Sequence, residues 1–302
     1  MRKYFPVNVL PLVIAATGVA GAQGGSVPGR DLLTYPLALV GEAPALPGAS
    51  GVGQFNPAAA WLPDSARWLL AVGSMSTPSD AGASGQLGGV STHWRGNTIT
   101  VSIVRASVSG LVRTDSDPLT IGDAVPYFTL VGSVGAARRV APHLTVGAAA
   151  RVHAGRIDQE SVTRAAFDGG FVADGLTRMD IRIAASSYLL TGDRATGGDP
   201  TLFAAVDARV LRRDPRMELR VGMSAAANAE RPSEQYAFAS LRVGPWDVRG
   251  GPVRTTAYGD SNVRHRLGVA LRYGGYALGL ARESSPNGLG PTYQFVLRSV
   301  LK

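Results

Sequence analysis

The chain alternates between apolar and polar residues over many short segments. The stretch Thr98-Ile99-Thr100-Val101-Ser102-Ile103 alternates strictly, and the longest such run extends from Val263 to Tyr273. One face of these segments is aliphatic and aromatic, while the other carries arginine, acidic residues, glycine, alanine and serine. A period of two is typical of β-strands whose two faces meet different surroundings. The pattern therefore predicts an all-β chain.

Fourteen segments of this kind follow one another along the chain, and their number is even. They predict strands at about 68–76, 86–95, 97–106, 127–139, 142–155, 162–173, 177–187, 201–213, 215–228, 235–243, 246–254, 262–273, 275–283 and 290–301.

The predicted connections alternate in length. Tight turns are expected at Gly96-Asn97, Ala141-Pro142, Asp174-Gly175, Asp214-Pro215, Gly244-Pro245 and Gly274-Gly275. Longer links are expected at 77–85, 107–124, 156–161, 189–200, 229–234, 255–261 and 284–289. Short turns at one rim and longer loops at the other are typical of outer-membrane barrels. We expect a transmembrane, antiparallel, up-and-down β-barrel of about fourteen strands, with twelve as the next alternative.

A closed barrel fixes which face of each strand points inward. In hydrocarbon every backbone amide needs a partner, so the strands close into a ring and the apolar face meets lipid. The residues then expected to line the lumen are Asp180, Arg182, Asp207, Arg209, Glu218, Arg220, Asp247, Arg249, Arg264, Arg266, Arg272 and Arg298. We expect these charges to form ion pairs that fill the interior, with selection of anions as the alternative. His265 would point outward, which a barrel tolerates near an interface.

Aromatic residues near predicted strand ends suit the headgroup level of a bilayer. Those expected there are Tyr188, Trp246, Tyr273, Tyr276 and Tyr293.

Residues 1–22 have the features of a secretory signal peptide. Met1-Arg2-Lys3 is basic, the following stretch is mostly apolar, and Ala20-Gly21-Ala22 is a small-x-small cleavage pattern. No later apolar run approaches the roughly 18 residues that a spanning helix needs. We expect Sec-dependent export to the outer membrane of a Gram-negative-type bacterium, with an N-terminal segment at 23–67 and the barrel at 68–302.

The sequence does not indicate an enzyme. It contains no cysteine, and its four histidines lack the spacing of a metal site. Ser261, in Gly259-Asp260-Ser261-Asn262, resembles the serine block of lipases, but it lies in a predicted loop without an activating histidine and acid. The formal net charge of +8 includes no basic run with interleaved aromatic residues, so nucleic acid is not an expected partner. We predict no catalytic residue, metal or cofactor.

The motif Asn56-Pro57-Ala58 precedes the first predicted strand. Pro57 fixes its own backbone and restricts Asn56, whose side chain can bond nearby amides, so the three residues predict a rigid turn. With the count of fourteen strands, this layout resembles the FadL-like outer-membrane barrel superfamily. The runs Leu144-Thr145-Val146-Gly147 and Phe167-Asp168-Gly169-Gly170 resemble its PorV/PorQ-type branch. The resemblance implies that Asn56, Pro57 and Ala58 belong to a hatch that plugs the barrel.

Two functions follow from this resemblance. The FadL-like transporters imply passive transport or binding of small hydrophobic compounds through a hatch-gated barrel. The PorV/PorQ-type branch implies a barrel that does not transport and instead docks exported proteins during secretion to the surface. The charged lumen departs from the apolar ligand pocket of the transporters. The expected partners are outer-membrane lipid, together with either a hydrophobic small molecule or an exported protein.

Overall fold

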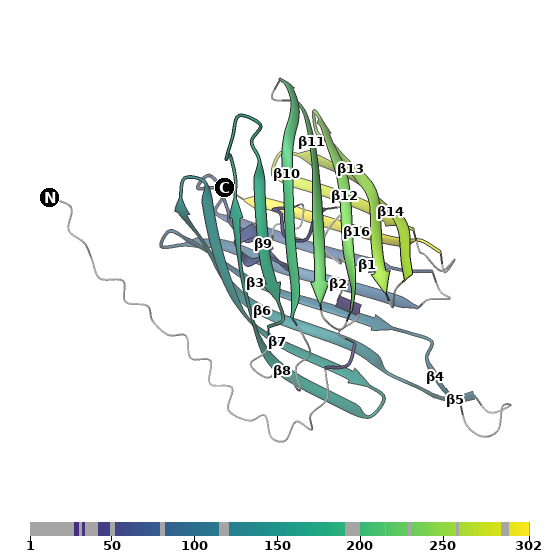
Figure 1. The fold of residues 1–302 in the computed structure, drawn as a ribbon. Coiled ribbons are helices and arrows are strands. Elements are labelled where there is room, and N and C mark those ends of the chain that lie inside the picture. The colour runs from purple at the N-terminus through teal and green to yellow at the C-terminus, as the bar shows by residue number, and fades with distance from the viewer. Residues whose placement is uncertain are drawn as a thin grey trace.

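The computed structural model is a closed antiparallel barrel of fourteen strands, which confirms the predicted fold class (Figure 1). The structure describes residues 27–29, 32–33, 42–48, 52–78, 82–114, 121–190, 200–214, 216–228, 231–257, 260–284 and 290–301. The expected signal peptide lies outside these residues.

The strands follow the order of the chain around the ring. Their bounds are β1 (Trp68–Ser76), β2 (Ala83–Trp94), β3 (Asn97–Val108), β6 (Tyr127–Ala141), β7 (Leu144–Ile157), β8 (Glu160–Ala173), β9 (Arg182–Tyr188), β10 (Thr201–Asp214), β11 (Met217–Asn228), β12 (Arg231–Val243), β13 (Trp246–Ala257), β14 (Asp260–Tyr273), β15 (Tyr276–Glu283) and β16 (Thr292–Leu301). A short hairpin of β4 (Val112–Thr114) and β5 (Ile121–Ala124) lies between β3 and β6 in the chain and projects from the wall (Figure 1).

Pairing between β1 and β16 closes the ring. The ladder runs from Trp68 opposite Leu301 to Ser76 opposite Tyr293. Because the number of strands is even, β1 begins and β16 ends at the same rim, which we call the proximal rim. The opposite rim is the distal rim.

The connection between β8 and β9 differs from the tight turn expected at Asp174-Gly175. β9 begins only at Arg182, so the predicted strand at 177–187 starts too early. Asp180 lies in this connection with a positive φ of 49°, and its carbonyl oxygen accepts a hydrogen bond from Arg220 at 2.6 Å. Asp180 therefore belongs to a proximal turn and not to a strand.

Three of the longer distal links are also shorter than expected. The links predicted at 156–161, 229–234 and 255–261 are wrong, because pairing continues to Ile157–Glu160, Asn228–Arg231 and Ala257–Asp260. Backbone hydrogen bonds form whatever the polarity of the side chains. The ladders therefore extend beyond the residues whose alternation marks the strands.

Side chains alternate between the inside and the outside of the wall. On β1, Leu69 and Ala71 are buried, while Leu70 and Val72 are exposed. On the sheet's outer face the exposed residues are mainly large and apolar, and His265 lies among them as expected. The outer face is thus apolar, while the buried face carries the charges described below.

Exposed aromatic residues gather at the proximal rim. Trp246 begins β13, Tyr273 ends β14 and Tyr276 begins β15, and each is at least 50% exposed. Trp68 and Trp94, at the proximal ends of β1 and β2, are exposed as well. This distribution fits the amphipathic belt of a membrane interface.

Tyr188 does not belong to that belt, so the prediction for this residue is wrong. Its side chain is buried and packs inside the barrel against Phe55, with ring centroids 5.1 Å apart. Tyr293, near the distal end of β16, is exposed.

The short 3₁₀-helix η2 (Pro57–Ala60) contacts β6, β7 and β8. In the part of the chain that the structure describes, no helix is long and apolar enough to cross a membrane.

The closing register can be tested with paired cysteines, because the chain has none of its own. Val72→Cys with Leu297→Cys places thiols on directly opposite residues, where Cα atoms about 4.5–5.5 Å apart permit a disulfide. We expect rapid cross-linking on oxidation, detected by peptide mass spectrometry. Val72→Cys with Phe295→Cys is the matched control, since its diagonal spacing of about 7–8 Å should give slow cross-linking. Preferential cross-linking of the control pair would contradict this register.

Candidate functional site: the barrel interior

The motif Asn56-Pro57-Ala58 is buried against the inner face of the wall. The Asn56 side chain caps η2, because its Oδ1 accepts a hydrogen bond from the Ala58 N–H at 3.0 Å. Its Nδ2 donates to the carbonyl oxygens of Ala45 at 2.7 Å and Phe171 at 3.1 Å. Asn56 thereby joins the turn to the preceding segment and to β8.

Three further side chains of the wall hold this segment. Ser186 on β9 donates its hydroxyl to the Phe55 carbonyl oxygen at 2.7 Å. Thr98 on β3 accepts a hydrogen bond from the Leu62 N–H at 3.0 Å. Arg151 on β7 donates to the carbonyl oxygen of Gln54. These contacts come from β3, β7 and β9, which lie within one arc of the ring, so the segment packs along that side of the interior.

Glycines in the wall provide the space for the motif. A Cβ atom at Gly147 would lie 2.5 Å from the carbonyl carbon of Pro57, and one at Gly170 would overlap the Asn56 side chain. Both distances are too short for non-bonded atoms. These glycines end the two runs that the sequence analysis compared with the PorV/PorQ-type branch, so a packing role explains both.

Arg151 and Asp168 form a buried ion pair beside the segment, and each side chain is at most 1% exposed. Asp168 Oδ1 also accepts a hydrogen bond from the Leu189 N–H at 2.7 Å. The Arg151 guanidinium lies 4.8 Å from the centre of the Tyr188 ring. Arg151 therefore connects a carboxylate, an aromatic ring and the N-terminal segment.

A larger group of charges, the β9–β11 cluster, lies in the proximal half of the interior. It joins three arginines to three carboxylates, namely Arg182, Arg209 and Arg220 with Asp180, Asp207 and Glu218. Asp207 is buried and accepts hydrogen bonds from both Arg182 and Arg220, the latter at 2.8 Å. A buried charge needs an opposite partner, and the equal numbers of the two signs meet this requirement.

The β12–β15 cluster lies closer to the distal rim and is also balanced. Arg264 and Arg266 on β14 face Glu234 on β12 and Glu283 on β15. Arg266 Nε lies 2.6 Å from Glu283 Oε2, and Arg266 Nη2 lies 3.3 Å from Glu234 Oε1. The Arg266 guanidinium also lies 4.9 Å from the centre of the Tyr236 ring.

The remaining predicted charges, together with Arg242 and Glu42, form a four-arginine cluster near the proximal rim. It comprises Arg242, Arg249, Arg272 and Arg298 with the carboxylates of Asp247 and Glu42. Asp247 Oδ2 lies 2.9 Å from Arg272 Nη2 and 3.4 Å from Arg242 Nη2. Arg249 Nη1 lies 3.2 Å from Glu42 Oε1, which links this cluster to the N-terminal segment.

Eleven of the twelve residues expected in the lumen occupy β9, β10, β11, β13, β14 and β16, and Asp180 joins them from its turn. Five further charges of the interior were not among the predicted residues, namely Arg151, Asp168, Arg242, Glu234 and Glu283. Position on the charged face of a predicted strand could have identified four of them, whereas Glu234 falls in the link expected at 229–234. Glu42 gave no such signal because it precedes the strands.

The histidines have structural contacts. A ring nitrogen of His93 lies 3.1 Å from the Pro63 carbonyl oxygen, one of His143 lies 2.9 Å from the Asp174 carbonyl oxygen, and one of His153 lies 2.7 Å from Thr129 Oγ1. Within the described ranges, no three His, Cys, Asp or Glu side chains are placed to hold a metal ion. Ser261 pairs with Thr256 at the distal start of β14.

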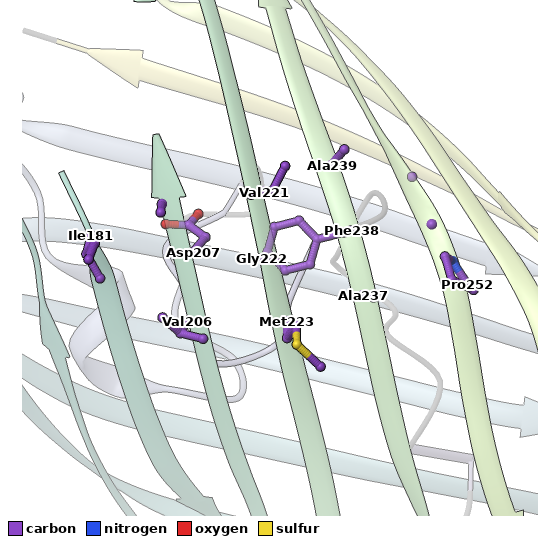
Figure 2. A pocket seen from close by; sticks show the side chains of 13 residues that line it. Ile181, Val206, Asp207, Val221, Gly222, Met223, Ala237, Phe238, Ala239 and Pro252 are labelled. Carbon is purple, nitrogen blue, oxygen red and sulfur yellow. The ribbon is translucent and has the colours of Figure 1, made fainter. Parts of the chain in front are cut away.

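Two hollows lie on the outer face of the wall and not in the lumen. One of about 600 Å³ extends over β10–β13, where exposed Val206 and Met223 are among the lining residues. Gly222 is another lining residue, and the Phe238 ring lies beside it (Figure 2). The other, of about 480 Å³, extends over β8–β11. Small residues in the outer surface create both hollows.

Comparisons with known proteins found solved structures of low sequence identity. No family model and no curated protein matches the sequence. OprB of Pseudomonas putida has a TM-score of 0.43 and 10% identity, covering 78% of this chain and 91% of its own. The outer membrane protein Omp33 of Acinetobacter baumannii has a TM-score of 0.48 and 8% identity, covering 78% and 98%. A triple mutant of the Rhodopseudomonas blastica porin has a TM-score of 0.42 and 10% identity, covering 77% and 99%. The FadL-like resemblance stays a prediction.

The packing of the motif against the wall can be tested at Gly147. We expect Gly147→Ala to lower the free energy of unfolding by about 1–3 kcal/mol, because the new methyl group must displace Pro57 and Ala58. Gly132→Ala on β6 is the matched control, since no atom lies within 4 Å of its added Cβ. Urea unfolding of the refolded barrel measures both variants. Equal stability of the two would show that the motif does not rest on β7.

Proposed function

We propose that this protein is an outer-membrane barrel that provides a passive route for small solutes, with its N-terminal segment acting as an internal gate. The observation that carries the proposal is the division of the wall into an apolar outer face and a charged inner face. Such a ring is stable in hydrocarbon while its interior remains polar.

The outer surface supports the membrane assignment. Large apolar side chains cover it, and exposed aromatic residues mark the proximal rim. A contiguous apolar surface of this kind needs a nonaqueous environment or a partner. The location in the outer membrane of a Gram-negative-type bacterium and Sec-dependent export are part of the proposal.

The nature of the solute follows from the interior. The resemblance to FadL-like transporters implies small hydrophobic compounds, for which a continuous apolar path would be needed. The ion-pair clusters that line the wall favour polar solutes instead. We therefore propose polar solutes, and we treat hydrophobic compounds and a docking role for exported proteins as outcomes that the experiment below distinguishes.

The gate is proposed from the way the motif is held. Three hydrogen bonds fix Asn56, and only one of them ends on the barrel wall. The segment is held by side-chain contacts and apolar packing and not by strand pairing, so it can move without breaking the backbone ladders that close the ring.

If the wall spans a membrane, the loss of stability caused by a charge on the outer face should depend on the depth of that charge in the bilayer. Val152 lies near the middle of β7 and is 56% exposed. We expect Val152→Arg to lower the free energy of unfolding in lipid vesicles by about 2–4 kcal/mol, because the charge would face hydrocarbon. Tyr273→Arg at the proximal rim should cost at most about 1 kcal/mol. Urea titration in vesicles measures both, and equal losses would argue against a membrane-spanning wall.

The gate predicts that loosening Asn56 increases solute flux. We expect Asn56→Ala to raise the uptake of a small polar solute into proteoliposomes, because it removes the bonds to Ala45, Phe171 and Ala58. Asn97→Ala is the matched control, since Asn97 bonds two carbonyl oxygens of its own turn near the proximal rim. Heat-modifiable gel mobility verifies folding of each variant.

The same assay separates the alternatives. Unchanged flux in a folded Asn56→Ala barrel would mean that the segment is a static plug. Increased uptake of a hydrophobic probe alone would favour the FadL-like function. Absence of flux for every solute, together with binding of an exported protein, would favour the secretion role.

A further inference from the structure

Three of the four charged groups described above are balanced and one is not. The Arg151–Asp168 pair, the β9–β11 cluster and the β12–β15 cluster each contain as many carboxylates as arginines. The four-arginine cluster contains two carboxylates for its four guanidinium groups. A net charge of about two units therefore lacks compensation among the described residues, although buried charges are costly without partners.

The hydrogen bonding of this cluster is incomplete. Asp247 forms ion pairs with both Arg242 and Arg272, and Glu42 forms an ion pair with Arg249. Arg298 forms no ion pair with any residue that the structure describes. The Nε groups of Arg242, Arg249 and Arg298 are buried and have no hydrogen-bond partner there. Donors of this kind cost free energy unless an acceptor reaches them.

Among the described residues, the neighbouring carboxylate of Glu218 does not supply the missing acceptors. Glu218 lies opposite Arg242 on the adjacent strand, but its ion pair at 3.4 Å is with Arg220. The excess of positive charge is therefore an excess among the residues that the structure describes.

Small residues flank the cluster in the register of the strands. Ala277 on β15 lies between Arg272 and Arg298 in the register, and Ala71 on β1 flanks Arg298 on the other side. The side chains of Arg242 and Arg272 are 38% and 41% exposed, so water and solutes reach them from the proximal rim. The side chains of Arg242 and Arg272 are therefore not sealed by the wall or the segment.

We infer that Arg242, Arg249, Arg272 and Arg298 form a binding site for a phosphate-type oxyanion inside the barrel. Guanidinium groups recognise such anions through paired N–H donors that match the spacing of two oxygens. An anion with two charges would balance the cluster and accept bonds from the unpartnered donors. A role of this site in solute passage rests on the proposed function. Binding of the anion requires only the folded barrel.

Inorganic phosphate is the probe for this site. Isothermal titration of the full chain, refolded in detergent, is carried out with phosphate against sodium chloride of equal ionic strength. We expect one phosphate per chain, and we expect Arg298→Gln to weaken binding about tenfold or more, since it removes a charged donor. Arg254→Gln is the matched control, because Arg254 is an exposed residue of β13, the strand that also carries Arg249. It should bind phosphate as the unchanged chain does.

Thermal unfolding is the second measurement, and it keeps the inference testable if Arg298→Gln changes the folding of the barrel. Without phosphate, Arg298→Gln should unfold at a higher temperature than the unchanged chain, because repulsion within the cluster is relieved. With phosphate, the unchanged chain should gain stability and the variant should not. Absence of phosphate binding by the folded unchanged chain, or equal binding by Arg298→Gln, would overturn the inference. Phosphate binding without any solute flux would support the site and count against the transport function.

Discussion

A ring of backbone hydrogen bonds, closed between β1 and β16, is the constraint on which the rest of this molecule depends. Each strand can satisfy its amides only through two neighbours, so the fourteen strands must all pair in order. Closure gives the sheet an inside and an outside, and the alternation of side chains then separates apolar residues from charged ones. Without closure, the arginines of the inner face would have no enclosed surroundings in which to meet their carboxylates.

The enclosed interior creates a packing problem that the chain solves in two ways. Part of the space is taken by the N-terminal segment, which brings Phe55 and Asn56 against β8 and β9. Glycines such as Gly147 and Gly170 make that approach possible, because any side chain there would collide with the segment. Elsewhere the space is taken by ion pairs between neighbouring strands, where long arginine side chains fill volume and satisfy carboxylates together.

These two solutions meet at Glu42 and Arg249. The contact joins the N-terminal segment to the four-arginine cluster. Among the described residues, this cluster has more arginines than carboxylates. A change in that cluster, such as the arrival of an anion, would compete with Glu42 for Arg249. The proposed gate and the inferred oxyanion site are therefore physically connected, although each has its own experimental test.

The sequence alone determined the barrel, its fourteen strands and the charged face of the wall, because alternation with a period of two is a local property that each strand carries in its own residues. It also marked Asn56-Pro57-Ala58 as a rigid turn. Only the tertiary structure decided that Asp180 lies in a turn, that Tyr188 points inward, and that Arg266 meets Glu234 and Glu283. These outcomes depend on the register between strands and on what the segment packs against. Both are fixed when the ring closes, and neither is encoded in the pattern of a single strand.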